Sequence, residues 1–232
     1  MFARILTSAL FAGAAAGFIA SLLQLYFVQP VLEHAELYES GELVHFGGEV
    51  VSAIQEKGGF QPVRDSLSII FTMLIYAGYS LVTVSAMALA EQRGNVLSTK
   101  QGIIWGIAGF IAVHFAPGFT LAPEVPGVAA ADVYARQIWW FATVASAVAA
   151  LWFIAFGSGM VTYGIAVLLL LAPHMIGAPE PDTFTGPVPT ELGALYAARA
   201  FGVGMAAWVL LGIFSAYFWQ RETTLENWTQ TA

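Results

Sequence analysis

Long, nearly uncharged apolar stretches are the feature that most restricts how this chain can fold. Only 10% of the 232 residues are charged. About 20 apolar residues in a helix, each rising about 1.5 Å, cross the roughly 30 Å hydrocarbon layer of a bilayer. We therefore predict an all-α, polytopic transmembrane helical bundle of about six spans, surrounded by the lipid bilayer. The predicted spans are 5–28, 67–90, 101–117, 138–156, 160–172 and 192–219.

The stretch 160–172 is the weakest of these candidates, because it has only 13 residues and follows Gly157-Ser158-Gly159. Five spans are therefore the alternative. The first stretch is longer than the core of a typical signal peptide, so we expect it to remain as the first helix rather than be cleaved. We expect a single transmembrane domain over 1–232, built from helical hairpins. Its predicted outer loops are an acidic loop at 29–66 and Pro-rich loops at 118–136 and 173–191.

Charged residues predict which side of the membrane each loop occupies. With six spans, Arg93 and Lys100 share one short loop, and Arg4 and Arg221 flank the outermost spans. The positive-inside bias acts most strongly at such places, so we expect both termini in the cytoplasm. Twelve of the fifteen carboxylates and all four histidines then face outward, where the net charge is −8. An acidic surface concentrates cations, although an acidic loop that is merely soluble is the alternative.

Several functional classes find no support in the sequence. The chain has no cysteine, so any metal ligands must be nitrogen or oxygen atoms. It lacks the phosphate-binding loop, the His-Glu-x-x-His zinc motif and the Gly-x-Ser-x-Gly nucleophile motif. We therefore predict that the chain is not an enzyme and carries no covalent cofactor. Since it has no basic cluster, nucleic acid is not a predicted partner.

The second half of the chain resembles a weak internal duplication, each copy being a helix, a Pro-rich loop and a second helix. Parallel repeats are common in transporters and place equivalent groups around a shared path, although chance similarity of Ala/Gly-rich segments is the alternative. Each copy has a histidine beside an Ala-Pro, and Gln29-Pro30 marks a candidate third copy. The matching segments are Gly106-Ile107-Ala108 with Gly164-Ile165-Ala166, Ala116-Pro117 with Ala172-Pro173, and Ala122-Pro123-Glu124 with Ala178-Pro179-Glu180.

Imidazole and carboxylate groups together suit divalent first-row metals such as cobalt, nickel or zinc. His114 and His174 lie at the ends of apolar spans, where an ionisable group is costly unless it faces a cavity or a partner. Purely interfacial histidines are the alternative. The acidic loop, which also carries Glu49 and Glu56, is either a surface that collects cations or simply a solvated one. If a helix continues over 30–40, Glu36 and Glu39 share one face and could hold one cation. The predicted metal-binding or entry residues are His114, His174, Glu124, Glu180, Glu36, Glu39 and Asp132.

Other features indicate packing rather than ligand binding. The pairs Gly13 with Gly17 and Gly102 with Gly106 form small-xxx-small faces, which let two helices approach closely. Aromatic side chains near the ends of two spans resemble the belt that sits at a membrane interface. They are Trp139, Trp140, Tyr217 and Trp219.

The histidine- and proline-containing motifs resemble those of the CbtA family, proposed cobalt-transporter subunits of bacteria. The resemblance lies in His114-Phe115-Ala116-Pro117-Gly118-Phe119-Thr120-Leu121-Ala122-Pro123-Glu124-Val125-Pro126-Gly127 and in Pro173-His174-Met175-Ile176-Gly177-Ala178-Pro179-Glu180-Pro181. Family members are expected to read Pro-Pro-Glu-Leu-Pro-Gly where this chain has Ala122-Pro123-Glu124-Val125-Pro126-Gly127, which retains the glutamate. The resemblance implies cobalt uptake linked to cobalamin synthesis, beside a small single-span, histidine-rich partner, CbtB.

Together these features predict a permease subunit of the bacterial inner membrane that captures divalent cobalt at an acidic, histidine-bearing outer face. A non-transporting scaffold or sensor with an acidic partner-binding loop is one alternative. A transporter of nickel or another cation is a second, because imidazole and carboxylate accept several metals. A homo-oligomer is also compatible with the sequence.

Overall fold

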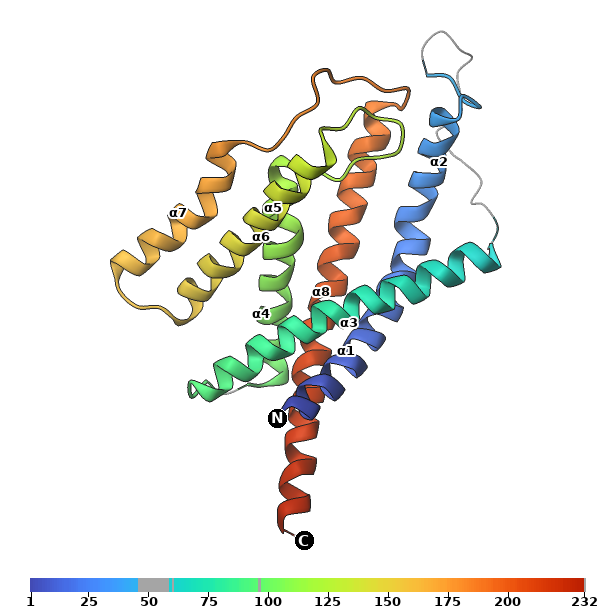
Figure 1. The fold of residues 1–232 in the computed structure, drawn as a ribbon. Helices are drawn as coiled ribbons and strands as arrows, with labels where there is room; N and C mark the ends of the chain where they lie inside the picture. Colours follow the sequence, from blue (N-terminus) through green and yellow to red (C-terminus); the bar gives the residue numbers. More distant parts are fainter. Residues whose placement is uncertain (46–58, 60, 96, 232) are drawn as a thin grey trace. The chain divides into compact units, whose positions relative to one another are not determined.

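A computed structural model describes residues 1–45, 59, 61–95 and 97–231, and the side chains of these residues up to 223. Within this part of the chain every regular element is helical, which confirms the predicted all-α class (Figure 1). The elements are α1 (Phe2–Leu23), the π-helix η1 (Gln24–Val28), α2 (Gln29–Glu39), α3 (Pro62–Gln92), α4 (Thr99–Phe110), the π-helix η2 (Ile111–Phe115), α5 (Ala116–Thr120), α6 (Val133–Phe156), α7 (Met160–Ile176) and α8 (Thr190–Thr231).

Five helical segments of the described residues are long and apolar enough to cross a membrane. They are Phe2–Glu39, Pro62–Gln92, Thr99–Thr120, Val133–Phe156 and Thr190–Thr223. The remaining apolar helix, α7, has 17 residues, which gives a length of about 26 Å. This is somewhat less than the hydrocarbon thickness. The helical bundle is thus confirmed, and a membrane crossing by α7 stays a prediction.

The segment predicted as the acidic loop 29–66 contains helical residues at both ends. α2 continues from η1 to Glu39, and α3 already begins at Pro62. α3 has a proline in its first turn, where the missing N–H removes no intrahelical hydrogen bond and the fixed φ suits a helix. Glu36 and Glu39 therefore lie on one helix, three residues apart, whereas Glu49 and Glu56 lie outside the described residues.

The helices group into two compact units. Unit 1 comprises Met1–Tyr26, Gly59–Phe110 and Val203–Ala232, and unit 2 comprises Phe27–Gly58 and Ile111–Gly202. The chain passes from one unit to the other four times, and three of these passages lie in helices: inside η1, at the start of η2 and within α8. Two of these three helical crossings therefore coincide with π-helices, in which the regular α-helical hydrogen bonding is interrupted.

Unit 1 is packed through glycines. α1 lies against α3 (Figure 1), and a Cβ placed on Gly17 would come within 2.7 Å of the Met73 Cα. α4 and α8 approach as closely, because a Cβ on Gly102 would lie 2.5 Å from the backbone oxygen of Gly212. Any larger residue would force these backbones apart. The structure thus confirms the close helix approach predicted from the two glycine pairs.

The buried end of unit 1 corrects the prediction for one aromatic residue. Trp219 is fully buried rather than interfacial. Its Nε1 donates a hydrogen bond to Glu91 Oε2 at 3.1 Å, and the Arg4 guanidinium lies 3.5 Å from the centroid of its ring. Arg4 also pairs with Glu91 at 3.1 Å. Trp219 packs inside the unit because its N–H and its ring face both satisfy charged neighbours there.

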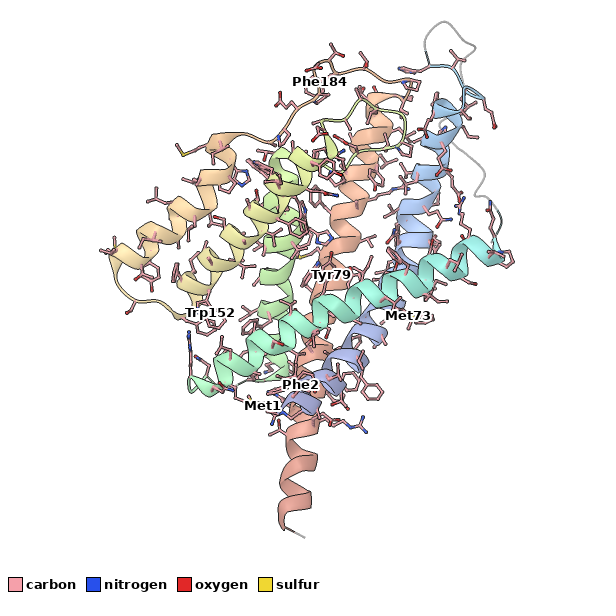
Figure 2. All side chains as sticks on the ribbon, viewed as in Figure 1. Met1, Phe2, Met73, Tyr79, Trp152 and Phe184 are labelled. Carbon is pink, nitrogen blue, oxygen red and sulfur yellow. The ribbon has the colours of Figure 1, made fainter. Side chains whose placement is uncertain are left out.

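Aromatic contact reinforces the same unit further along α3. The rings of Tyr79, labelled in Figure 2, and Trp208 of α8 have centroids 4.9 Å apart. Next to them, the buried hydroxyls of Ser80 and Ser215 lie 3.1 Å apart and share a hydrogen bond. Unit 1 therefore contains polar groups that satisfy one another within the helical bundle.

Candidate functional site

All seven residues predicted to bind or collect metal belong to unit 2. His114 lies in η2, and His174 lies in the last turn of α7. The five carboxylates are on α2 and on the loops 121–132 and 177–189, and they are Glu36, Glu39, Glu124, Asp132 and Glu180. The relevant geometry is therefore that of the prolines that end the helices of this unit and of the loops that follow them.

Three prolines determine how these helices end. A proline has no N–H, so the carbonyl four residues before it loses its helical hydrogen bond. η1 ends two residues before Pro30, and η2 ends two residues before Pro117. Near a proline in a membrane helix, local π-turns and side chains of neighbouring helices can satisfy the freed backbone groups. The matching position of the two π-helices supports the interpretation of the first hairpin as a third copy of the repeat.

Pro173 is accommodated in a different way. It lies inside α7, and the carbonyl four residues earlier belongs to Leu169. Ser146 of α6 donates its hydroxyl to that carbonyl at 2.6 Å. Nearer the start of α6, Trp139 Nε1 donates a hydrogen bond to the Pro173 carbonyl at 3.2 Å. α6 thus supplies two side-chain donors to α7, its neighbour in the hairpin (Figure 1).

The two histidines occupy different positions relative to these prolines. His114 comes three residues before Pro117, whereas His174 comes directly after Pro173. The counterpart of His174 in the first copy is therefore Gly118. A Cβ on Gly118 would lie 2.5 Å from Cζ of Phe201, so an aromatic ring fills the space that a side chain would need. Only one copy can present an imidazole at this position without rearrangement.

His174 is half-buried and is held on several sides. Its Nδ1 lies 3.1 Å from the hydroxyl of Thr120. The ring stands nearly edge-on to Phe119, at a centroid distance of 5.5 Å, and it also contacts Trp139 at 6.1 Å. Trp139 is buried in these contacts, so its predicted place in an interfacial belt is wrong. Contacts on several sides restrict the orientation of the imidazole.

His114 has more closely packed surroundings. It is half-buried in η2, between Ala112 and Ala116, which pack with Ala147 of α6 in a small hydrophobic cluster. Small side chains on both sides bring this part of η2 close to α6. The position combines an irregular helix with an ionisable side chain inside an apolar segment, which is a frequent property of functional positions in membrane helices.

The carboxylates lie on a folded cap, which we define as α2 together with the loops 121–132 and 177–189. Ala35 and Tyr38 of α2 form a buried cluster with Val125 and Val188 from the two loops. The loops also bond to each other, since Ala129 N donates to Thr185 O at 2.8 Å. The apolar core of the cap explains why segments so rich in proline and charge adopt a defined structure.

Two of the five carboxylates predicted to bind or collect metal are already engaged. Glu124 forms an ion pair with Arg136 at 2.9 Å, and about 30% of each of these side chains is exposed. Asp132 caps the N-terminus of α6 by accepting a hydrogen bond from Ala135 N at 2.9 Å. Such a cap stabilises a helix by roughly 1 kcal/mol. A metal ion would have to displace these partners to bind either carboxylate fully.

The other three carboxylates, Glu36, Glu39 and Glu180, are exposed. Within the described residues the structure brings together no group of three or more histidine or carboxylate side chains that could hold a metal ion. The predicted ligands are thus placed on one unit but not in one cluster. The exposed carboxylates of this arrangement can attract a hydrated cation by their charge.

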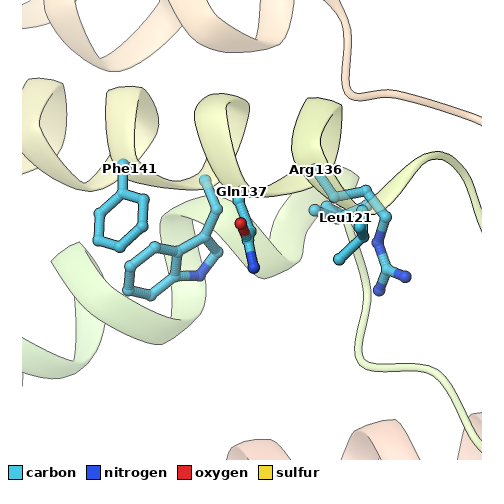
Figure 3. A pocket seen from close by; sticks show the side chains of 6 residues that line it. Leu121, Arg136, Gln137 and Phe141 are labelled. Carbon is cyan, nitrogen blue, oxygen red and sulfur yellow. The ribbon is translucent and has the colours of Figure 1, made fainter.

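A pocket of about 400 Å³ lies beside the Glu124–Arg136 pair. Figure 3 shows Leu121 from the loop with Arg136, Gln137 and Phe141 from α6, and Val133 and Trp140 complete the lining. Phe184, on the loop between α7 and α8, is 80% exposed (Figure 2). The pocket and the loop tip show that the cap retains apolar surface as well as charge.

Sequence reasoning missed two residues that now belong to the site. Arg136 was not among the predicted site residues, although opposite charges within one predicted Pro-rich loop, 118–136, are a signal for the Glu124–Arg136 pair. Thr120 gave no signal, because its contact with His174 joins residues 54 positions apart. Hydrogen bonds between distant positions depend on the tertiary fold and cannot be found from local pattern.

Comparison with known proteins gives one match. The family described as "Probable cobalt transporter subunit (CbtA)" matches residues 2–220, which include parts of both units. No curated protein and no solved structure matches the chain. Because the matched region covers nearly the whole sequence and contains every motif discussed above, the chain belongs to the CbtA family, described as probable cobalt transporter subunits.

Proposed function

We propose that this chain is the permease subunit of a cobalt uptake system in the bacterial inner membrane, and that the imported Co²⁺ serves cobalamin synthesis. The observation that carries the proposal is the family match over residues 2–220. Five helices able to cross a bilayer support a path through the membrane. No enzymatic role is part of the proposal.

In this proposal the cap faces outward and captures the cation. Glu36, Glu39 and Glu180 are exposed there, and clustered negative charge raises the local concentration of cations. His174, held at the end of α7, is the first nitrogen ligand on the way in, and His114 is the second. Single ligands bind a hydrated metal weakly, which suits a path that must release its cargo.

The proposed topology places both termini in the cytoplasm and has six crossings. It requires α7 to span the membrane with 17 residues, which a local thinning of the bilayer or flanking polar residues can accommodate. The family description as a subunit implies at least one partner. We propose a small, single-span, histidine-rich protein of the CbtB type, which would present cobalt or complete the path.

The first test is radiolabelled cobalt uptake into proteoliposomes that contain this chain alone or with the small partner. We expect uptake that nickel inhibits and magnesium hardly affects, because imidazole ligands favour late first-row metals. Equal inhibition by magnesium would indicate a carboxylate path without histidine. Absence of uptake, even with the partner, would overturn the permease role and favour a scaffold or sensor.

The second test is the double variant His114→Ala, His174→Ala, compared with wild type at equal amounts in the membrane. We expect cobalt accumulation to fall to the background of cells that lack the protein. Unchanged accumulation would remove both histidines from the mechanism while leaving the family assignment intact.

A further inference from the structure

The contact between Thr120 and His174 joins the two copies of the repeat. Thr120 is the last residue of α5, in the first copy, and His174 belongs to α7, in the second. Their side chains meet at 3.1 Å through the Nδ1 atom of the imidazole. This contact uses Nδ1 and leaves the second ring nitrogen, Nε2, outside the hydrogen bond.

The environment makes this orientation specific. Phe119 and Trp139 contact the imidazole ring through their own rings. The backbone carbonyl just before His174 accepts hydrogen bonds from both Trp139 Nε1 and Gly177 N, at 3.2 and 3.1 Å. A ring held by its neighbours, on a backbone held by two donors, has little freedom to turn its Nδ1 towards another partner.

We propose that Thr120 is a positioning residue for His174, in that its hydroxyl accepts the Nδ1–H of the neutral imidazole and so leaves the Nε2 lone pair to bind a divalent cation. This inference rests on the proposed function, which makes His174 a metal ligand. A metal-binding histidine almost always donates its other ring N–H to an oxygen acceptor, which fixes the tautomer and orients the ring. Thr120 supplies that oxygen here.

A histidine and a hydroxyl could also meet with the proton on the opposite side, the hydroxyl donating to Nδ1 while Nε2 carries the hydrogen. That tautomer has no lone pair at Nε2 and could not bind the cation through it. The two arrangements have the same heavy-atom distance but opposite consequences for metal binding, so the tautomer is the quantity to measure.

The decisive measurement is the ¹⁵N NMR spectrum of the histidine rings in full-length protein reconstituted in nanodiscs. The chain has four histidines, and His174→Gln identifies the His174 signals by their loss. We expect a protonated Nδ1 and an unprotonated Nε2, and Co²⁺ should perturb the Nε2 signal first. A protonated Nε2 in the wild-type protein would overturn the proposal without any reference to transport.

Three variants at threonines complete the test. Thr120→Val removes the hydroxyl at nearly constant shape and should give a mixture of tautomers, with a cobalt affinity about tenfold weaker, the lower end of the effect of such supporting residues. Thr120→Ser keeps a hydroxyl, so it should keep the wild-type tautomer and a cobalt affinity within about twofold of that of the wild type. Thr162→Val is the matched control, since that hydroxyl bonds locally to the Ser158 carbonyl, just before α7 begins.

The outcomes separate this inference from the proposed function. If His174→Gln abolishes cobalt uptake but Thr120→Val changes neither tautomer nor affinity, Thr120 has no positioning role and the permease function stands. If His174→Gln leaves uptake unchanged, capture by His174 is wrong whatever the tautomer. Should Thr120→Val fail to fold, the wild-type tautomer and the Thr120→Ser affinity still decide the question.

Discussion

The two copies of the repeat have the same backbone plan but present different side chains. In each copy the first helix ends three residues after its proline, at Thr120 and at Ile176. The position after the proline is Gly118, packed against Phe201, in one copy and His174 in the other. The loop glutamates differ too, since Glu124 is paired with Arg136 and Glu180 is exposed.

On the predicted duplication, the two copies share the position at which a helix ends after its proline and differ in the side chains beside it. The first copy uses its position after the proline for packing and its loop glutamate for an ion pair. In the second copy the position after the proline is a half-buried imidazole, and the loop carboxylate is exposed. If the proposed function is right, the second copy is the one that meets the cation.

The largest expected effect is a difference in cobalt uptake between variants of the two loop glutamates, Glu180 and Glu124. Glu180→Gln should lower the initial rate of cobalt uptake by about tenfold, the lower end of the effect of electrostatic steering. Glu124→Gln should lower it much less, because the Arg136 guanidinium already neutralises that carboxylate. Uptake by both variants, measured at equal protein level and low ionic strength, checks the difference. Equal losses would mean that the copies contribute alike.

The second prediction concerns the packed position of the first copy. Gly118→Ala should destabilise the protein by about 1–3 kcal/mol, the usual cost of overpacking, because its Cβ would lie 2.5 Å from the Phe201 ring. Gly164→Ala in α7 is the matched control, since nothing lies within 4 Å of a Cβ there. The free energy of unfolding in mixed micelles measures both. A stable Gly118→Ala variant would show that the Phe201 ring moves aside easily.

The third prediction concerns the proline of the second copy. Ser146→Ala should cost about 1 kcal/mol, because it leaves the Leu169 carbonyl without the hydroxyl that bonds to it. In the Pro173→Ala background the cost should shrink, since the substituted alanine would supply a backbone N–H to the same carbonyl. Ser85→Ala, whose hydroxyl bonds only within α3, serves as the control. Additive effects of Ser146→Ala and Pro173→Ala would contradict this coupling.

The smallest expected effect is that of Arg136→Gln. A partly exposed ion pair contributes about 0–1 kcal/mol, so the stability should change little. Releasing Glu124 should make the first copy resemble the second and raise cobalt affinity by up to about fivefold, which corresponds to the same energy. Isothermal titration with cobalt would detect the change, and Arg136→Lys, which keeps the charge, should not show it. A weaker affinity in Arg136→Gln would mean that the arginine supports the site.

The sequence was sufficient for the class of fold and for the closest helix contacts. Apolar runs predict membrane helices because lipid penalises charged side chains. Glycine pairs predict close helix contacts because they leave room for a second backbone, as at Gly17 and Gly102. Neither signal says which partner a polar group will find. Trp139 and Trp219 were therefore expected at the membrane interface, whereas each donates its Nε1 hydrogen bond inside a unit.

The candidate site was predictable only in part for the same reason. Composition and motifs placed both histidines near the ends of apolar helices, where the structure also has them. The state of His174 depends on a partner distant in sequence, Thr120, and that of Glu124 depends on Arg136 of the following helix. The segment after Pro30 is a further case. The sequence left a loop and a helix both open there, and the burial of Ala35 and Tyr38 against the loops of the cap stabilises the helix.

The hydrogen bond from Ser146 to Leu169 also bears on how the chain enters the membrane during synthesis. Alone, α7 is a short segment with a proline inside it and a backbone carbonyl that lipid cannot satisfy. α6 precedes it on the chain and carries the hydroxyl that meets this need. We therefore expect the insertion machinery to release α6 and α7 into the bilayer as a pair, with α6 retained at the site of insertion until α7 has emerged from the ribosome.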